Sequence, residues 1–138
     1  MYQYSGKCRC GSVLITFSSP QQINSYTSRK CDCDYCMQRD IEYLSAPQGQ
    51  ISFISKTPLR HEKQGSGQAT FLLCSNCQTV VGVCSMNKNM CVGSLNIKLF
   101  EEFVCLQASV NVSPKRLSKT EKLTRWNAMW SPVQIIIG

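Results

Sequence analysis

Two kinds of segment are missing from this sequence of 138 residues. Its longest apolar runs, such as Ile135–Ile137, fall far short of the ~20 residues that a membrane span requires. The first residues, Met1 to Lys7, contain no apolar signal segment. We therefore expect a cytoplasmic protein without membrane segments, and the length fits a single domain over residues 1–138. In a reducing compartment, clustered cysteines indicate metal binding or catalysis rather than disulfides.

Acidic residues and histidine are also scarce. Eight Asp and Glu stand against fifteen Lys and Arg, which gives a formal net charge of +7, and there is one histidine. A basic balance suggests an acidic partner such as nucleic acid. However, a four-cysteine zinc centre carries about −2 and a three-cysteine centre about −1, so a chain that holds both has a charge of about +4. The charge is therefore a weak signal.

Cysteine, in contrast, is abundant. The chain has ten cysteines, and seven of them fall into three tight clusters: Cys8 and Cys10; Cys31, Cys33 and Cys36; and Cys74 and Cys77. Thiols gather in this way around a metal, in a redox couple or in a disulfide framework. The spacings differ from those usual for iron–sulfur clusters, so zinc is the metal that we expect.

The clusters differ in what they can build. A tetrahedral zinc site is usually assembled from two short ligand pairs, which predicts a structural zinc held by Cys8, Cys10, Cys74 and Cys77. That site would join the first strand to a distant hairpin. The other cluster has no partner pair, so its zinc would keep a fourth position open, as catalytic zinc sites do; its ligands would be Cys31, Cys33 and Cys36.

Other candidate ligands carry weaker signals. His61 is the only histidine and could close the three-cysteine site, although nothing near it in the sequence marks it as a ligand. Cys84, Cys91 and Cys105 lie in apolar strand patterns, so we expect them to be packed as small hydrophobic residues.

The donor set of the open site predicts a reaction class. Three anionic sulfurs make zinc a poor Lewis acid for water but suit it to holding a soft thiol as thiolate. A thiol held in this way is a positioned nucleophile toward an electrophilic carbon. The pattern thus predicts thiol activation.

Alternation and turn residues predict a mainly β fold: a zinc-stapled β-sheet domain with one short C-terminal helix. Val13, Ile15 and Phe17 show the two-residue period of a strand with one buried face. We expect a turn at Gly65–Gly67. Strands are predicted around the thiol-bearing turn within residues 4–17, and at 24–30, 50–55, 69–74, 79–85, 91–95 and 103–112.

The helix is predicted from Ser118 to about Trp130, because Ser118 and Glu121 fit a capping box. One face should be packed and would carry Leu123, Trp126 and Trp130. The opposite face is either solvated or a surface for nucleic acid. Its cations, with those just upstream, are Lys115, Arg116, Lys119, Lys122 and Arg125.

Four segments resemble, in order, the glutathione-dependent formaldehyde-activating enzyme family, which includes the centromere protein V relatives and has an Mss4-like β fold. They are Gly6–Gly11, the Cys-x-Cys-x-x-Cys at 31–36, the Cys-x-x-Cys at 74–77, and Val92–Leu95, within about residues 4–100; Trp126 is a further match. The resemblance implies a structural zinc on the two cysteine pairs and a catalytic zinc on the other three cysteines. It also implies glutathione as the thiol, formaldehyde as the electrophile and S-hydroxymethylglutathione as the product of a carbon–sulfur lyase.

The chain departs from that family pattern beside the ligands. Arg9 stands where histidine is common, Asp32 and Asp34 flank Cys33, and Gln78 replaces a usual glycine. The two acids would disfavour an anionic substrate unless nearby cations offset them, the candidates being Arg29, Lys30 and Arg39. Two alternatives to the enzyme therefore stay open: a zinc module that binds a partner or nucleic acid through its basic helix, and a thiol protein that exchanges zinc.

Overall fold

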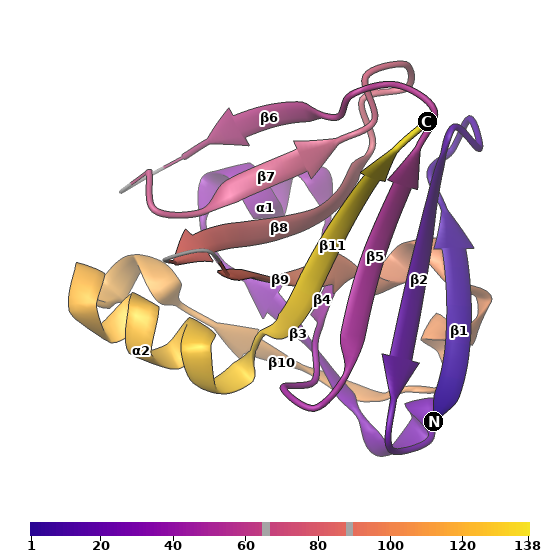
Figure 1. The fold of residues 1–138 in the computed structure, drawn as a ribbon. Coiled ribbons are helices and arrows are strands. Elements are labelled where there is room, and N and C mark those ends of the chain that lie inside the picture. The colour runs from indigo at the N-terminus through magenta and orange to yellow at the C-terminus, as the bar shows by residue number, and fades with distance from the viewer. Residues whose placement is uncertain (65–66, 88–89) are drawn as a thin grey trace.

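The computed structural model describes residues 1–64, 67–87 and 90–138. Eleven strands within these ranges belong to one open sheet, which bends so that two groups of strands cross each other (Figure 1). We call these groups the first arm and the second arm of the sheet. Both predicted cysteine sites lie where the chain leaves a strand.

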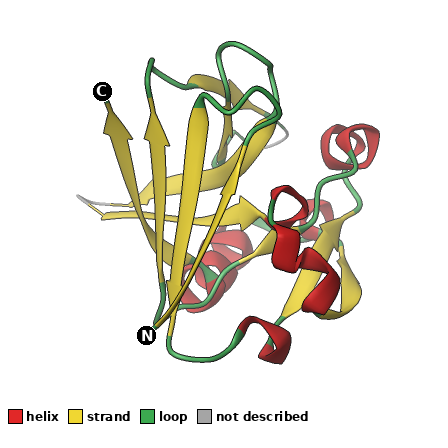
Figure 2. Cartoon of the chain, turned by 90° about the vertical axis from the view of Figure 1, so that its right-hand side faces the viewer, coloured by secondary structure: helices red, strands yellow, loops and turns green. Residues whose placement is uncertain are grey.

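The first arm contains β1 (Tyr2–Lys7), β2 (Val13–Ser19), β5 (Gln50–Ser55) and β11 (Ser131–Ile137). The first three strands pair antiparallel, whereas β11 pairs parallel with β5. Val13, Ile15 and Phe17 are fully buried, which confirms the alternation read from the sequence. Figure 2 shows these strands side by side, with most helical segments to their right.

The second arm follows the order β10–β3–β4–β9–β8–β7–β6. Its strands are β3 (Thr27–Cys31), β4 (Tyr43–Leu44), β6 (Arg60–Lys63), β7 (Thr70–Leu73), β8 (Val80–Asn87), β9 (Met90–Asn96) and β10 (Gln107–Val112). Ser131 and Pro132, at the start of β11, pair with β9 and so connect the arms. At this crossing a Cβ on Gly93 would clash with the carbonyl oxygen of Val83, so only glycine fits there.

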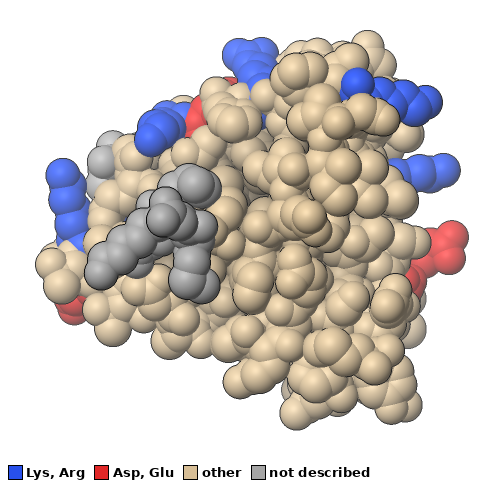
Figure 3. All heavy atoms as spheres, in the orientation of Figure 1, with Lys and Arg blue, Asp and Glu red and all other residues tan. Residues whose placement is uncertain are grey.

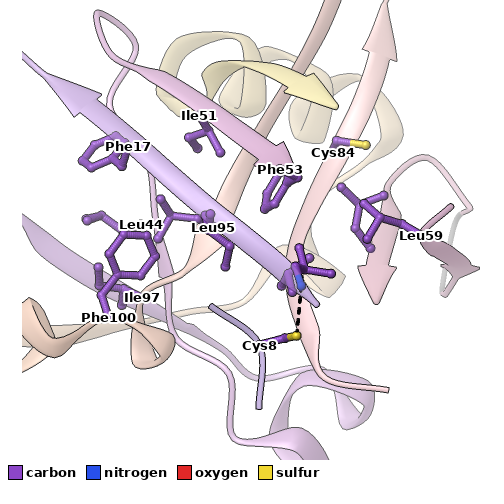
Figure 4. Packing of buried hydrophobic residues seen from close by; sticks show 14 of the residues in the cluster. Cys8, Phe17, Leu44, Ile51, Phe53, Leu59, Cys84, Leu95, Ile97 and Phe100 are labelled. Carbon is purple, nitrogen blue, oxygen red and sulfur yellow. Dashed lines mark hydrogen bonds between the residues drawn. The ribbon is translucent and has the colours of Figure 1, made fainter. Parts of the chain in front are cut away.

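The main core lies between the two arms. Phe17, Ile51 and Phe53 from the first arm are fully buried together with Leu44 and Leu95 from the second. Figure 4 shows part of this cluster, including Cys8 at its edge. The outward face of the first arm carries few charged side chains, and Lys and Arg lie around its rim (Figure 3).

A second cluster covers the opposite face of the second arm. It is closed by α1 (Asp34–Arg39) and by α2 (Lys119–Met129), whose predicted Ser118–Glu121 capping box is present. Trp126 and Trp130 are buried and stack with ring centroids 4.6 Å apart. No helix in the described part of the chain is long and apolar enough to cross a membrane.

Several expected elements differ in the structure. The strand predicted over 103–112 begins only at Gln107, because residues 101–105 form the 3-10 helix η3 (Glu101–Cys105). Cys105 is exposed, and so is Leu123, against the prediction that both are packed. Three more 3-10 helices are η1 (Ile23–Ser25), which precedes β3, η2 (Ile97–Leu99) and η4 (Pro114–Arg116).

Some strands carry little local signal in the sequence, and one expected turn lies mostly outside the described residues. The strands β4, β6 and β11 were not predicted at all. The turn expected at 65–67 falls mainly outside the described residues, since Gly65 and Ser66 are not among them.

Candidate functional site

The two cysteine pairs meet at the end of the first hairpin. Cys8 and Cys10 lie between β1 and β2, whereas Cys74 and Cys77 lie between β7 and β8. All four sulfurs lie within 4.8 Å of one another, and Cys10 Sγ is 3.6 Å from the sulfurs of Cys8 and of Cys74. Zinc bound tetrahedrally at ~2.3 Å from each sulfur would hold the sulfurs ~3.8 Å apart. The described geometry therefore fits a zinc ion.

Backbone amides support these sulfurs. The Val13 N–H donates to Cys8 Sγ at 3.3 Å, and the Cys77 N–H donates to Cys74 Sγ at 3.5 Å. Such bonds favour the thiolate that a metal requires. Gln78, which stands where the family pattern has glycine, takes the left-handed conformation with φ of 62° and donates its N–H to the Cys74 carbonyl. Gln78 thus adopts a backbone conformation that glycine takes more readily.

The thiol groups of this cluster differ in acidity. Hydrogen bonds with Ser12, and further ones with Asn76, lower the pKa of Cys10 to about 5. Burial raises the pKa of Cys77, but hydrogen bonds with Thr79 help to outweigh it, and the resulting pKa is about 7. Burial raises the pKa of Cys74 to about 11. Cys10 is therefore a thiolate at neutral pH, whereas a metal would displace the proton of Cys74.

The three-cysteine cluster is built by the junction of β3 and α1. Cys31 ends β3, Cys33 is the N-cap of α1, and Cys36 lies in its first turn, where its N–H donates to Cys33 Sγ at 3.4 Å. Their sulfurs lie within 4.8 Å of one another. Among the described residues, no histidine, carboxylate or further cysteine joins this group, and His61 is exposed on β6. A metal held here would have an open position.

Hydrogen bonding within this cluster concentrates the negative charge on one sulfur. The hydrogen bond from Cys36 lowers the pKa of Cys31 to about 6, although burial opposes the shift. The same hydrogen bond, together with burial, raises the pKa of Cys36, and burial raises that of Cys33. The buried Tyr43 hydroxyl lies 3.1 Å from Cys36 Sγ and fixes its position. The cluster thus offers one ready thiolate and two thiols that a metal would deprotonate.

A cavity of about 380 Å³ opens beside the three-cysteine cluster. Its apolar wall comes from Phe71, Val83 and the Trp126–Trp130 stack. Its remaining walls carry thiols and cations, and those polar lining residues include Cys31, Cys33, Cys36, Arg29, Asp34, Tyr43, Lys115, Lys122 and Arg125. The volume suits a small molecule with a polar, charged end.

Arg29 is a largely buried cation in this wall. Its guanidinium donates to Ser45 Oγ at 2.6 Å and to Ser94 Oγ at 3.4 Å. Burial lowers its pKa to about 10, and the positive charge of Arg125 contributes to the shift. Even at that pKa the group stays protonated at neutral pH.

The two acids beside Cys33 point to different places. Asp32 accepts a hydrogen bond from the Ser113 hydroxyl, and Lys115 donates to the Asp32 carbonyl, so Asp32 ties the segment after β10 to the cysteine loop. Asp34 is exposed and lines the cavity. Of the three cations expected to offset these acids, Arg29 lines the cavity, whereas Lys30 is exposed and Arg39 lies over the Tyr35 ring.

The structure brings together all seven cysteines in the two groups that the sequence predicts. Sequence reasoning missed Tyr43 and Phe71, which lie in strands without a recognisable motif. It placed Trp126 and Trp130 on one helix face but assigned them only to packing. Of the five cations given to a solvated or nucleic-acid surface, three line the cavity: Lys115, Lys122 and Arg125.

Comparison with known proteins gives a likeness in fold alone. No protein-family model and no curated protein matches the chain. The crystal structure of a Rhodobacter sphaeroides protein, a structural genomics target, superposes with a TM-score of 0.53 at 20% sequence identity. The match covers 70% of this chain and 87% of that one.

Proposed function

We propose that this chain is a zinc-dependent carbon–sulfur lyase-like enzyme with an Mss4-like fold, similar to the glutathione-dependent formaldehyde-activating enzymes. The observation that carries the proposal is the three-cysteine cluster, whose sulfurs converge at a cavity wall without a fourth ligand from the described part of the chain. A closed structural site would not need a cavity of about 380 Å³ beside it. Glutathione is the leading thiol, and formaldehyde the leading electrophile.

Cys31, Cys33 and Cys36 would hold the catalytic zinc. When bound there, zinc supplies a Lewis acid that keeps an external thiol deprotonated near neutral pH. In the reaction the thiol sulfur forms a bond to the aldehyde carbon, the π electrons of the C=O bond move to oxygen, and that oxygen takes up the proton that the thiol lost. The product is the S-hydroxymethyl thioether.

The chain's own residues would position the reactants. Phe71 and the Trp126–Trp130 stack form an apolar wall that would exclude water from the thiol end of the cavity. The Tyr43 hydroxyl holds Cys36 in place. The cations around the cavity attract an anionic thiol such as glutathione and offset the charge of Asp34.

A test compares Cys33→Ser with Cys105→Ser. Cys105 is exposed and belongs to neither cluster, so its variant is a matched control. Formation of S-hydroxymethylglutathione, followed by NMR exchange, should exceed the uncatalysed rate with wild-type protein and Cys105→Ser. It should fall to the uncatalysed rate with Cys33→Ser. Normal turnover by a folded Cys33→Ser protein would refute the proposed site.

A zinc-exchanging thiol protein is the second candidate, and the half-exposed state of Cys31 and Cys33 favours it. Loss of one zinc on mild oxidation, without turnover of any thiol and aldehyde tested, would support this candidate over the enzyme. A nucleic-acid surface gains less support, since three of its five expected cations line the cavity. Binding to duplex DNA that weakens steeply with salt would support the nucleic-acid surface.

A further inference from the structure

The Arg29 guanidinium is held by two serines that cannot neutralise it. Ser45 Oγ donates its own hydrogen to the Met129 carbonyl at 2.7 Å, and Ser94 Oγ donates to the Leu44 carbonyl at 2.9 Å. Both hydroxyls can therefore only accept from Arg29, as the contacts at 2.6 and 3.4 Å indicate. The serines orient the guanidinium and leave its charge in place.

Among the residues that the structure describes, no carboxylate forms an ion pair with Arg29, although Asp34 lines the same cavity. The ion pairs found among the described residues join Arg60 to Glu62 and Lys98 to Asp40. A second guanidinium, that of Arg125 on α2, lines the same cavity. Both bonds to the serines start from a single nitrogen of Arg29, so its other N–H donors are available.

We propose that Arg29, assisted by Arg125, binds an oxyanion group of the small molecule that occupies the cavity, either a carboxylate or a phosphate. A guanidinium presents paired N–H donors that match both oxyanions. The apolar part of the ligand would lie against Trp126 and Trp130, and its far end would face the three-cysteine cluster. The inference deepens the proposed function and rests on it for the thiol end, but the binding step needs no turnover.

The test uses S-methylglutathione, which keeps both carboxylates but has no thiol to bind zinc. The chain's two tryptophans both line the cavity, so the intrinsic fluorescence of the zinc-loaded protein reports binding. The diethyl ester of the same compound keeps the ammonium group but has no carboxylate, so it is the comparison without an oxyanion. Inorganic phosphate is the competitor that separates the two oxyanions. All titrations are run at one ionic strength.

We expect the diacid to bind roughly tenfold or more tightly than its diethyl ester, because hydrogen bonds between charged groups are lost in the ester. Arg29→Gln should weaken binding of the diacid by roughly tenfold or more, and Arg125→Gln by a smaller factor. Neither change should weaken binding of the ester. Arg116→Gln is the matched control, since Arg116 is exposed and does not line the cavity, and its affinity should equal that of the wild type.

Equal affinities for diacid and ester would overturn the proposal, and so would unchanged diacid affinity in both cavity variants. Arg29 would then serve only to balance the thiolate charge. If Arg29→Gln fails to fold, as judged by near-ultraviolet circular dichroism, Arg125→Gln decides alone. If phosphate displaces the diacid at a concentration lower than that of the diacid, the oxyanion site is supported and phosphate is its ligand. If binding depends on the two arginines but no turnover is observed, the proposed enzymatic activity is refuted and the oxyanion site is supported.

Discussion

Removing one ligand from each cysteine pair should destabilise the protein far more than an equal change in the three-cysteine cluster. The double variant Cys10→Ser, Cys77→Ser spares the buried Cys8 and Cys74, so it removes ligands with little loss of packing. The bridge from Cys10 to Cys74 closes a loop of 64 residues. Treated as a cross-link, such a bridge lowers the entropy of the unfolded chain by an amount worth about 4 kcal/mol.

The matched variant is Cys31→Ser, Cys33→Ser, which likewise replaces two cysteines that are not buried. The three-cysteine cluster spans only residues 31–36, so the same treatment gives about 2 kcal/mol. In a chain of this size, roughly 3–4 °C of melting temperature correspond to each kcal/mol. We therefore expect the first variant to melt about 12–16 °C below the wild type and the second about 6–8 °C below it.

The assay is thermal unfolding followed by circular dichroism, with zinc-loaded protein under reducing conditions. Cys105→Ser should have the same melting temperature as the wild type, and this variant controls for the loss of any thiol. Equal shifts for the two double variants, or a larger shift for Cys31→Ser, Cys33→Ser, would refute the argument that the cysteine pairs staple distant parts of the sheet.

Three further predictions follow from local contacts. Ser118→Ala removes the cap of α2 and should lower the free energy of unfolding in urea by about 1 kcal/mol, whereas no change would show that the cap is dispensable. Gly93→Ala puts a Cβ against the Val83 carbonyl oxygen and should cost about 1–3 kcal/mol or more in the same assay; a neutral result would contradict the close crossing. In metal-free protein the hydrogen bond from Cys36 lowers the pKa of Cys31 to about 6. Because its thiolate form prevails above that pKa, alkylation of Cys31 by iodoacetamide, measured by mass spectrometry, should be near its plateau at pH 7.5 and fall as the pH drops through 6, and a rise only near pH 9 would contradict this.

Features with a local signature could be predicted from the sequence. The strand alternation in Val13–Phe17 and the capping box at Ser118 depend on neighbours within a few residues, and both are present. The cysteine groups could be predicted for a related reason, because each short pair already fixes two ligand directions. The sheet brings the two cysteine pairs together in space. The presence of two short pairs was nevertheless enough to infer that they form one site.

Features that depend on distant partners could not be predicted. The strand β11 pairs parallel with β5 and touches β9 only at Ser131 and Pro132, so no hairpin turn announces it. Residues 103–105 look strand-like in composition, but they lie in a 3-10 helix, and Val104 is 85% exposed.

The cavity also combines features that the local sequence predicts with features that depend on distant partners. The spacing of Trp126 and Trp130 placed them on one face of a helix, and that prediction is confirmed. That this face closes a cavity beside three cysteines depends on how α2 packs against β9, which no local pattern encodes. Arg29 was predicted only as a possible offset for the nearby acids, because a buried charge cannot be distinguished from a surface charge before the fold is known.

The measurement that tests the central claim most directly is the zinc content per chain, by elemental analysis of protein purified under reducing conditions without added metal. Two ions per chain are predicted, one for the four-cysteine site and one for the three-cysteine cluster. In Cys33→Ser the content should fall to one ion. A single ion in the wild type that excess zinc cannot raise would contradict a metal at the cavity, and with it the proposed chemistry.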